Sequence, residues 1–312
     1  MARILIASVL GVSALLPVPL LAQGAAPYTI VESGRTFSRL QDAVNAIGGG
    51  TATIRIAPGR YADCAVQEAG DVTFIAEVPG EAVFEGEACE DKAGLVLRGH
   101  STHVEGLVFA GEHSSSGNGA GIRAERGQIS ISQVWFRDSQ QGILSSDDPA
   151  GSITVDKSTF TRLGTCAFSA GCAHSIYVGN FGALTVTRSR FEIGRGGHYL
   201  KSRAARIGVF GNSFDDSAGK WTNYMIDLPA GATGRIANNW FVQGKEKENY
   251  SAFIAVGAEE KLHSSAGLMI EANDARLVPG LDRPTAWVAD WSGEATLGAN
   301  VLGEGLKKYE RR

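Results

Sequence analysis

Hydrophobic and polar positions repeat along this chain in a six-residue phrase that returns every 23 to 34 residues. The phrase reads apolar, two variable residues, a small residue, one variable residue, then Phe. Clear copies begin at Val104, Ile131, Val155, Val186, Val209 and Ile236, and weaker copies begin at Ile270 and Leu297. Self-similarity with this period predicts a solenoid, in which each unit buries its apolar face only against its neighbours.

Within each repeat the apolar residues alternate with polar ones. Short runs rich in Val, Ile and Leu, such as 129–131, 152–155 and 183–186, have a period of two. This pattern with β-branched residues indicates strands, and Gly, Asn, Asp and Ser mark the turns between them. The sequence therefore predicts an all-β coil.

One segment has helical spacing instead. Leu40, Val44 and Ile47 fall at positions i, i+4 and i+7, which predicts a helix over 38–47. Ser38 is the expected N-cap, and the glycines of 48–50 are expected to end the helix.

This helix is followed by a strand and then by the residues Pro58 to Tyr61, which read PGRY. The order resembles the N-terminal cap of right-handed parallel β-helix proteins of the pectate-lyase and pectin-esterase type. Such a cap covers an edge that would otherwise pair with other chains. The small position of the phrase extends the resemblance, since its occupants are Ser158, Ser189, Asn212, Asn239, Asn273 and Asn300.

Asn tolerates left-handed backbone and bonds to its own turn, and stacked Asn residues can also bond to one another. Asparagine ladders of this kind are familiar in the pectate-lyase-like superfamily. The resemblance covers residues 28–305 and implies a right-handed parallel β-helix of nine or ten coils. The repeated Asn and Phe residues are then structural.

Four segments follow along the chain. Residues 1–22 carry Arg3 and an apolar run, which predicts a secretory signal peptide. Residues 23–60 are expected to form the cap and first strand, 61–305 the β-helix, and 306–312 a solvated charged tail. The mature protein is expected to be periplasmic or secreted.

Four cysteines are an even number, as expected in an oxidising compartment. Cys64 and Cys89 lie about one coil apart, and Cys166 and Cys172 close a small loop. We favour the 64–89 and 166–172 disulfides over the other two pairings. Zinc is a weaker alternative because no C-x-x-C or paired His spacing accompanies these cysteines.

The net charge and the hydropathy of the chain argue against two kinds of partner, nucleic acid and a membrane that the chain would span. The net charge is −4 with both signs interspersed, which argues against nucleic acid, because nucleic acid requires a concentrated basic face. After the leader, no segment is long and apolar enough to span a membrane. We expect a monomer.

Reactive side chains are densest over residues 174–228. If Ile176, Leu200 and Ile226 are equivalent inward residues, their offsets match the repeat. Side chains alternate along a strand, so Tyr177, Lys201 and Asp227 point outward in one row. His174 then lies over His198, and Arg203 and Arg206 follow the Lys201 strand. A slip of one residue would turn the row inward, and Lys201 and Asp227 can also be read as a surface ion pair.

This set suits β-elimination on an acidic polysaccharide, or epimerisation at C5. Both reactions remove the C5 proton of a uronic acid after its carboxylate is neutralised. Arg203 or Arg206 is the expected carboxylate partner, and Lys201 or neutral His198 the expected base. Tyr177 or His174 is the expected acid for the leaving oxygen. The resemblance implies similar chemistry, because many β-helix lyases and epimerases use Arg, Lys, His or Tyr in these roles.

Neighbouring aromatic residues are candidates for substrate contact. Trp221 and Tyr250 lie in segments expected to leave the coils, where they either stack on sugar rings or anchor their loops. Tyr224 precedes the Asp227 strand. Together with Asp227 and Arg206 they complete the predicted substrate-binding set.

Two other functions remain open, and calcium-dependent catalysis is not favoured. Calcium-dependent lyases of this superfamily carry outward Asp and Glu clusters, which the sequence does not supply, so we expect no metal and no organic cofactor. A polygalacturonase-type hydrolase needs two carboxylates, of which only Asp227 is well placed. A non-catalytic polysaccharide-binding or surface-assembly solenoid is the alternative from another class.

Overall fold

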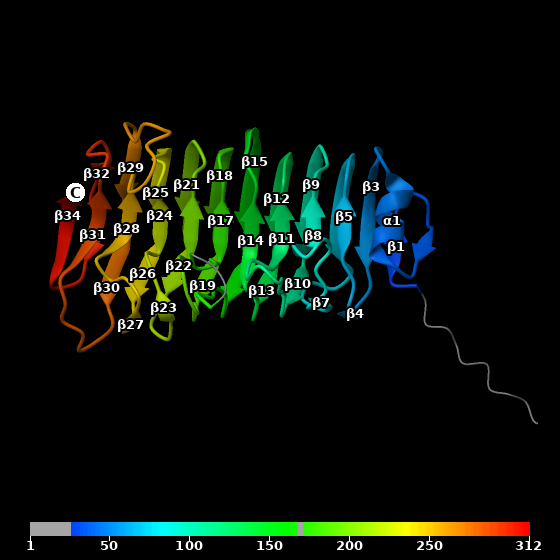
Figure 1. Ribbon diagram of the computed structural model, residues 1–312, viewed down its shortest axis with the longest axis horizontal. Helices are drawn as coiled ribbons and strands as arrows, with labels where there is room; N and C mark the ends of the chain where they lie inside the picture. Colours follow the sequence, from blue (N-terminus) through cyan, green and yellow to red (C-terminus); the bar gives the residue numbers. More distant parts are fainter. Residues whose placement is uncertain (1–25, 168–170) are drawn as a thin grey trace, which may run out of the picture.

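The computed structural model describes residues 26–167 and 171–312. It is a parallel β-solenoid of about nine turns, the architecture expected for a right-handed β-helix. Figure 1 shows its strands side by side along one axis, from α1 (Leu40–Ile47) at one end to β34 (Leu306–Arg311) at the other. The predicted signal peptide lies outside the described residues.

Three sheets run along the molecule, and a typical coil contributes one strand to each. Sheet A contains β1 (Tyr28–Ile30), β2 (Thr36–Phe37), β3 (Thr51–Ile56), β6 (Asp71–Ala76), β9 (Ser101–Glu105), β12 (Gln128–Ser132), β15 (Asp148–Asp156), β18 (Phe181–Thr187), β21 (Arg206–Phe210), β25 (Thr233–Ala237), β29 (Leu268–Glu271) and β32 (Thr296–Leu297). Sheet B contains β4 (Gly59–Tyr61), β7 (Ala82–Glu85), β10 (Leu107–Ala110), β13 (Trp135–Arg137), β16 (Thr159–Thr161), β19 (Arg190–Glu192), β22 (Ser213–Asp215), β26 (Trp240–Gln243), β30 (Asp274–Leu277) and β33 (Val301–Leu302).

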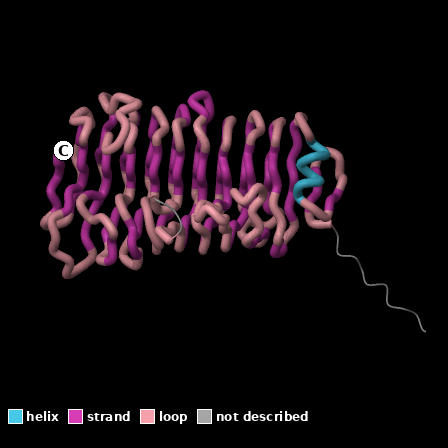
Figure 2. Tube along the Cα trace, in the orientation of Figure 1, coloured by secondary structure: helices cyan, strands magenta, loops and turns pink. Residues whose placement is uncertain are grey.

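Sheet C carries the side chains of greatest chemical interest. It contains β5 (Ala65–Gln67), β8 (Ala93–Leu97), β11 (Ala120–Ala124), β14 (Gln141–Ser145), β17 (Ile176–Val178), β20 (Leu200–Ser202), β24 (Ile226–Leu228), β28 (Ala252–Val256), β31 (Thr285–Asp290) and β34. A small extra sheet pairs β23 (Lys220–Thr222) with β27 (Glu246–Lys247). In Figure 2, loops join the strands along both edges of the molecule.

The predicted Phe position forms a continuous stack inside the coils. Neighbouring rings lie 4.6–5.6 Å apart between centroids, as expected when equivalent residues of stacked strands meet. The stack comprises Phe84, Phe109, Phe136, Phe160, Phe191, Phe214 and Phe241. These residues are fully buried, so their structural role is confirmed.

The predicted asparagine ladder is also confirmed. The backbone N–H of Asn212 donates to Oδ1 of Asn239 at 2.9 Å, and that of Asn239 donates to Asn273 at 3.0 Å. Asn300 continues the series, and Ser189 accepts in the same way from the backbone N–H of Ser158. Each side chain satisfies a buried donor of the preceding coil, which would be costly to leave unpaired.

One detail of the ladder differs from the prediction. The left-handed residue is the one before the small position, as at Lys157, Arg188 and Asn238. The ladder residue itself keeps ordinary backbone. Its side chain can therefore reach along the molecule to the neighbouring coil, while its predecessor makes the bend.

The predicted helix caps the N-terminal end, and its start differs from expectation. Leu40, Ala43 and Val44 are buried. Arg39, and not Ser38, is the N-cap, and its side chain makes no capping bond. Oδ2 of Asp63 instead accepts from the backbone N–H of Leu40 at 2.8 Å. The cap therefore comes from a residue distant in sequence, which local reading could not identify.

The expected solvated tail is a strand. Residues Leu306–Arg311 form β34, which pairs with β31 and completes sheet C. Tyr309 and Leu306 pack against the core, and Oη of Tyr309 donates to Asp290 at 3.0 Å. The alternating apolar and charged residues of this segment are therefore not a solvated tail. They form the strand that covers the last coil.

Both favoured disulfides are present, Cys64–Cys89 and Cys166–Cys172. The cysteines are therefore paired with one another, which overturns the zinc alternative. Within the described ranges, no helix has the length and apolarity to cross a membrane.

Candidate active site

The predicted register of sheet C is correct. Ile176 pairs with Leu200 and Leu200 with Ile226, so Tyr177, Lys201 and Asp227 stand opposite one another on β17, β20 and β24. We call these three residues the central row. Leu144 and Ala255 flank it, as expected. The row is polar because three successive strands each place a reactive side chain on one outer face.

Lys201 lies at the centre of this row. Its Nζ is 3.3 Å from Oδ2 of Asp227 and 2.8 Å from Oε1 of Glu259. Arg203 follows it, contacts Oε2 of Glu259, and donates from Nη1 to Oη of Tyr177 at 3.1 Å. Two cations thus face outward with carboxylates beside them.

The predicted stacking of His174 over His198 is confirmed. Their ring centroids are 5.0 Å apart, and the other face of His198 stacks on Tyr224 at 5.6 Å. We call His174, His198 and Tyr224 the aromatic row. Nδ1 of His174 accepts from the backbone N–H of His198 at 2.9 Å, so the ring proton of a neutral His174 is on Nε2. Nε2 of His198 lies 3.4 Å from Oδ2 of Asp227, which joins the two rows.

Burial and neighbouring charge perturb several of these groups. Desolvation, with the positive charges of Lys201 and Arg203, lowers the pKa of His174 to about 3. Desolvation also lowers the pKa of His198 well below its ordinary value. Burial raises the pKa of Asp227 to about 6 against the opposing charge of Lys201, and Glu259 adds to the rise. At neutral pH both imidazoles are neutral and Asp227 is mostly ionised.

The side chains of the site lie at two depths. Asp227 points to the outer face but is covered, with 4% of its side chain exposed, whereas Lys201 retains 12%. Oδ1 of Asp227 and Nδ1 of His198 are buried and lack a hydrogen-bond partner within the described part of the chain. Such orphaned, perturbed groups concentrate at functional sites. Tyr177, Lys201 and Arg203 can touch a ligand, and Asp227 and His198 lie behind them.

Sequence reasoning missed two charged residues here. Glu259 follows β28 on a loop whose return cannot be read from strand periodicity. Arg123 stands on β11 in the same row as Tyr177, two strands earlier. It lines a cavity of about 370 Å³ with His174, Tyr177 and Gln141. The sequence repeat was sufficient to predict that Arg123 lies in this row.

Other predicted residues lie outside the two rows. Arg206 begins β21 in sheet A and is exposed. Trp221 is 68% exposed on β23, and Tyr250 is 43% exposed beneath the Arg283 guanidinium. Backbone pairing of Asn223 with Gly197 brings the β23 segment beside the aromatic row.

A buried ion pair supports that segment. Nζ of Lys247 lies 3.1 Å from Oδ2 of Asp216, and both side chains are fully buried. Oδ1 of Asp216 accepts from Tyr199 at 2.9 Å and Thr222 at 2.7 Å. The pair fastens β23 and β27 to the coils, and it is fully buried rather than exposed on the outer face of sheet C.

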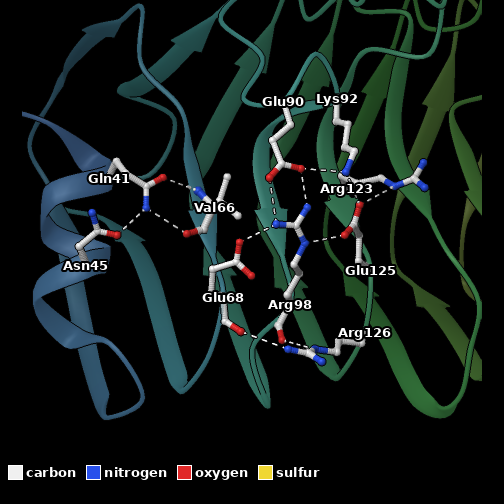
Figure 3. Close-up of polar contacts among 10 residues, drawn as sticks. All are labelled: Gln41, Asn45, Val66, Glu68, Glu90, Lys92, Arg98, Arg123, Glu125 and Arg126. Carbon is white, nitrogen blue, oxygen red and sulfur yellow. Dashed lines mark hydrogen bonds and ion pairs between the residues drawn. The ribbon is translucent and has the colours of Figure 1, made fainter.

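Further toward the N-terminus, charged residues form a balanced network. Figure 3 shows Arg98 among Glu68, Glu90 and Glu125, with Lys92 beside the latter two. The Arg98 side chain is paired with carboxylates on each side. Arg123 lies at the edge of this network, 3.6 Å from Glu125, and its buried Nε has no hydrogen bond within the described residues.

The described ranges contain no group of three or more His, Cys, Asp or Glu residues arranged to hold a metal.

Solved structures show which known proteins share the fold of this chain. The chain is similar to pectate lyase Pel9A, with a TM-score of 0.54 and 14% identity over 88% of this chain and 75% of that one. It shares the parallel β-helix fold of that enzyme.

A second similar structure is ORF18 of Geobacillus virus E2. Its TM-score is 0.51 at 14% identity, and the match covers 86% of this chain but only 55% of the viral protein. No family model and no curated protein sequence matches the chain. At these identities, the shared parallel β-helix fold is what the comparisons establish.

Proposed function

We propose that this protein acts on a uronate-containing polysaccharide by removing the C5 proton, with β-elimination or C5 epimerisation as the outcome. The observation that carries the proposal is the central row with Arg203. A tyrosine hydroxyl, a lysine amine and a guanidinium lie together on the outer face of sheet C, supported by Asp227 and His198. We propose this face as the groove that holds the polymer. The fold shared with a pectate lyase supports an extended polymer as substrate.

The roles follow from what each group can reach. Arg203 binds the sugar carboxylate and offsets the charge that develops on it. Lys201 takes the C5 proton as the general base. In elimination, the C5–H electron pair forms the C4–C5 double bond, the C4–O bond breaks, and Tyr177 protonates the leaving oxygen. In epimerisation, that bond remains and a proton returns to C5 on the opposite face.

Asp227 and His198 are positioning residues in this scheme. Asp227 contacts both Lys201 and His198, and His198 is held between two rings. His198 is neutral and remains a second candidate base, but burial separates it from a polymer in the groove. Since the mature chain carries two disulfides, we propose a periplasmic or secreted location.

Hydrolysis is the second candidate, and one observation favours it. Two carboxylates, Asp227 and Glu259, contact the same Lys201 ammonium. The pKa of Asp227 is raised, while that of Glu259 is lowered by Lys201 and Arg203 in spite of partial burial. Carboxylates with separated pKa values suit an acid and a base of a glycosidase. Elimination ranks first because Asp227 is covered.

The test uses pectate, alginate and hyaluronan with three proteins: wild type, Lys201→Ala and Lys308→Ala. Lys308 is exposed on β34 and serves as the matched control. Wild type and the control should remove the C5 proton of at least one polymer, seen as ultraviolet-absorbing unsaturated uronate or as C5 inversion by NMR. Lys201→Ala should lose about 100- to 10,000-fold in rate. New reducing ends on saturated products would assign hydrolysis, and binding without turnover would assign the non-catalytic alternative.

A further inference from the structure

The strongest unexplained contact near the groove is made by Glu259. One oxygen of its carboxylate lies 2.8 Å from Nζ of Lys201, and the other contacts Arg203. The side chain is 44% exposed, so it approaches these cations from the solvent side. Nothing in the coil architecture requires a carboxylate here, because the row is already held by strand pairing.

The backbone that carries Glu259 is fixed to the coils. The N–H of Glu259 donates to the carbonyl of Pro229 at 3.0 Å, and that of His263 donates to Ala230 at 2.9 Å. The His263 ring also bonds to the carbonyl of Arg203 at 3.2 Å. The loop therefore aims this carboxylate at the groove, and the side chain can leave by rotation without unfolding the loop.

We propose that Arg203 forms the subsite for the carboxylate of the substrate sugar, and that Glu259 is its intramolecular occupant, displaced from Arg203 and Lys201 when a uronate binds. The inference rests on the proposed function and adds how the site selects its ligand. A uronate replaces one carboxylate by another, so the negative charge beside Arg203 is conserved. A neutral sugar cannot make this exchange, because it brings no negative charge to replace that of Glu259.

Two features make the exchange feasible. Arg203 also donates to Tyr177, so its guanidinium stays oriented when Glu259 leaves. The contacts of Glu259 are partly exposed, and ion pairs in water contribute little, so displacement costs little. The same carboxylate also helps to raise the pKa of Asp227, which provides a separate readout of its removal.

The experiment compares wild type, Glu259→Gln and Glu260→Gln by isothermal titration. The ligands are tetramers of galacturonate and mannuronate and a hyaluronan tetrasaccharide, with cellotetraose as the neutral probe. Glu260 is the next residue, exposed and of equal charge, so its variant is the matched control. Glu259→Gln should bind at least one uronate oligomer about five- to tenfold more tightly, whereas Glu260→Gln should match wild type. Cellotetraose affinity should not rise.

An unchanged or weaker uronate affinity in Glu259→Gln overturns the inference, as does failure of all three anionic oligomers to bind that variant. Complete loss of reducing-end release in Glu259→Gln, with saturated products in wild type, overturns it in favour of a hydrolytic role. Tighter uronate binding without C5 proton removal in any protein would uphold the subsite and reject the proposed catalysis. The two claims can therefore fail separately.

Discussion

At the scale of single residues, the buried carboxyls are the most informative. Glu112 has both oxygens buried without a hydrogen-bond partner in the described part of the chain. Burial raises its pKa to about 9, and the negative charge of Glu87 adds to the effect. The folded protein therefore keeps this proton at neutral pH, whereas the unfolded chain loses it.

We predict that Glu112→Gln gains stability relative to wild type as pH rises. Between the unfolded pKa of 4.5 and about 9, the unfolded state binds fewer protons, so wild-type stability falls with increasing pH. The gain at pH 8 over pH 5 should be roughly 4 kcal/mol. Denaturant unfolding at both pH values measures it. The exposed Glu87→Gln variant should show a much smaller change, and a pH-independent gain would refute the assignment.

Asp227 gives a second residue-scale prediction. It must be ionised to hold Lys201 and His198, so kcat/KM should fall as pH drops through about 6. Asp227→Asn should lose about 100-fold in rate through misplacement of Lys201, and should no longer show that acidic limb. The measurement is kcat/KM as a function of pH for wild type and Asp227→Asn. An unaltered acidic limb in Asp227→Asn would contradict this role of Asp227.

The register of Tyr177, Lys201 and Asp227 was predictable because each is one residue beyond an inward apolar position of the repeat. The depth at which each of these side chains is buried was not predictable. Asp227 is buried, and Glu259 reaches the neighbouring Lys201 from a loop that carries no periodic signal. Periodicity predicts which face a side chain occupies, and tertiary contacts decide how deep it lies.

At the scale of elements, local sequence signals predicted the type of an element better than the residues at which it begins and ends. The α1 spacing was sufficient to predict a helix, but its capping acceptor, Asp63, is 23 residues away. The ladder positions were identifiable because Ser or Asn recurs at the small position of the phrase from Ser158 to Asn300. The left-handed residue before this position was not identifiable, since Lys157, Arg188 and Asn238 share no residue type.

The α1 cap supplies an element-scale prediction. Asp63→Ala should destabilise the protein by about 1 kcal/mol, because the N–H of Leu40 loses its acceptor. Ser38→Ala, which removes the cap expected from sequence, should be neutral. Denaturation midpoints of the two variants and wild type test this. A larger loss of stability in Ser38→Ala than in Asp63→Ala would contradict this prediction and assign the N-cap to Ser38.

At the scale of the whole molecule, each coil contacts mainly its neighbours, so a link between coils matters more than one within a loop. The Cys64–Cys89 pair spans 25 residues and joins the first coils, whereas Cys166–Cys172 spans 6. Replacing the first pair with Ser should cost about 3 kcal/mol and the second about 2 kcal/mol, from loop-closure entropy alone. Equal midpoints for the two double variants would contradict this ordering.

The whole fold was predictable because one phrase repeats often enough to identify a solenoid and its ladder. The last strand was missed because Leu306–Arg311 departs from the phrase and is charged. The reaction cannot be deduced in the same way, since it depends on a few side chains of different coils and on one loop.

The central claim is that this groove removes the C5 proton of a uronate. It is tested most directly by incubating the protein in D₂O with pectate, alginate and hyaluronan, followed by NMR of the recovered sugars. The account predicts either a C4–C5 double bond or deuterium at C5 in at least one polymer, abolished in Lys201→Ala. Retention of the original C5 proton in all three polymers, while one of them is bound or hydrolysed, would contradict it.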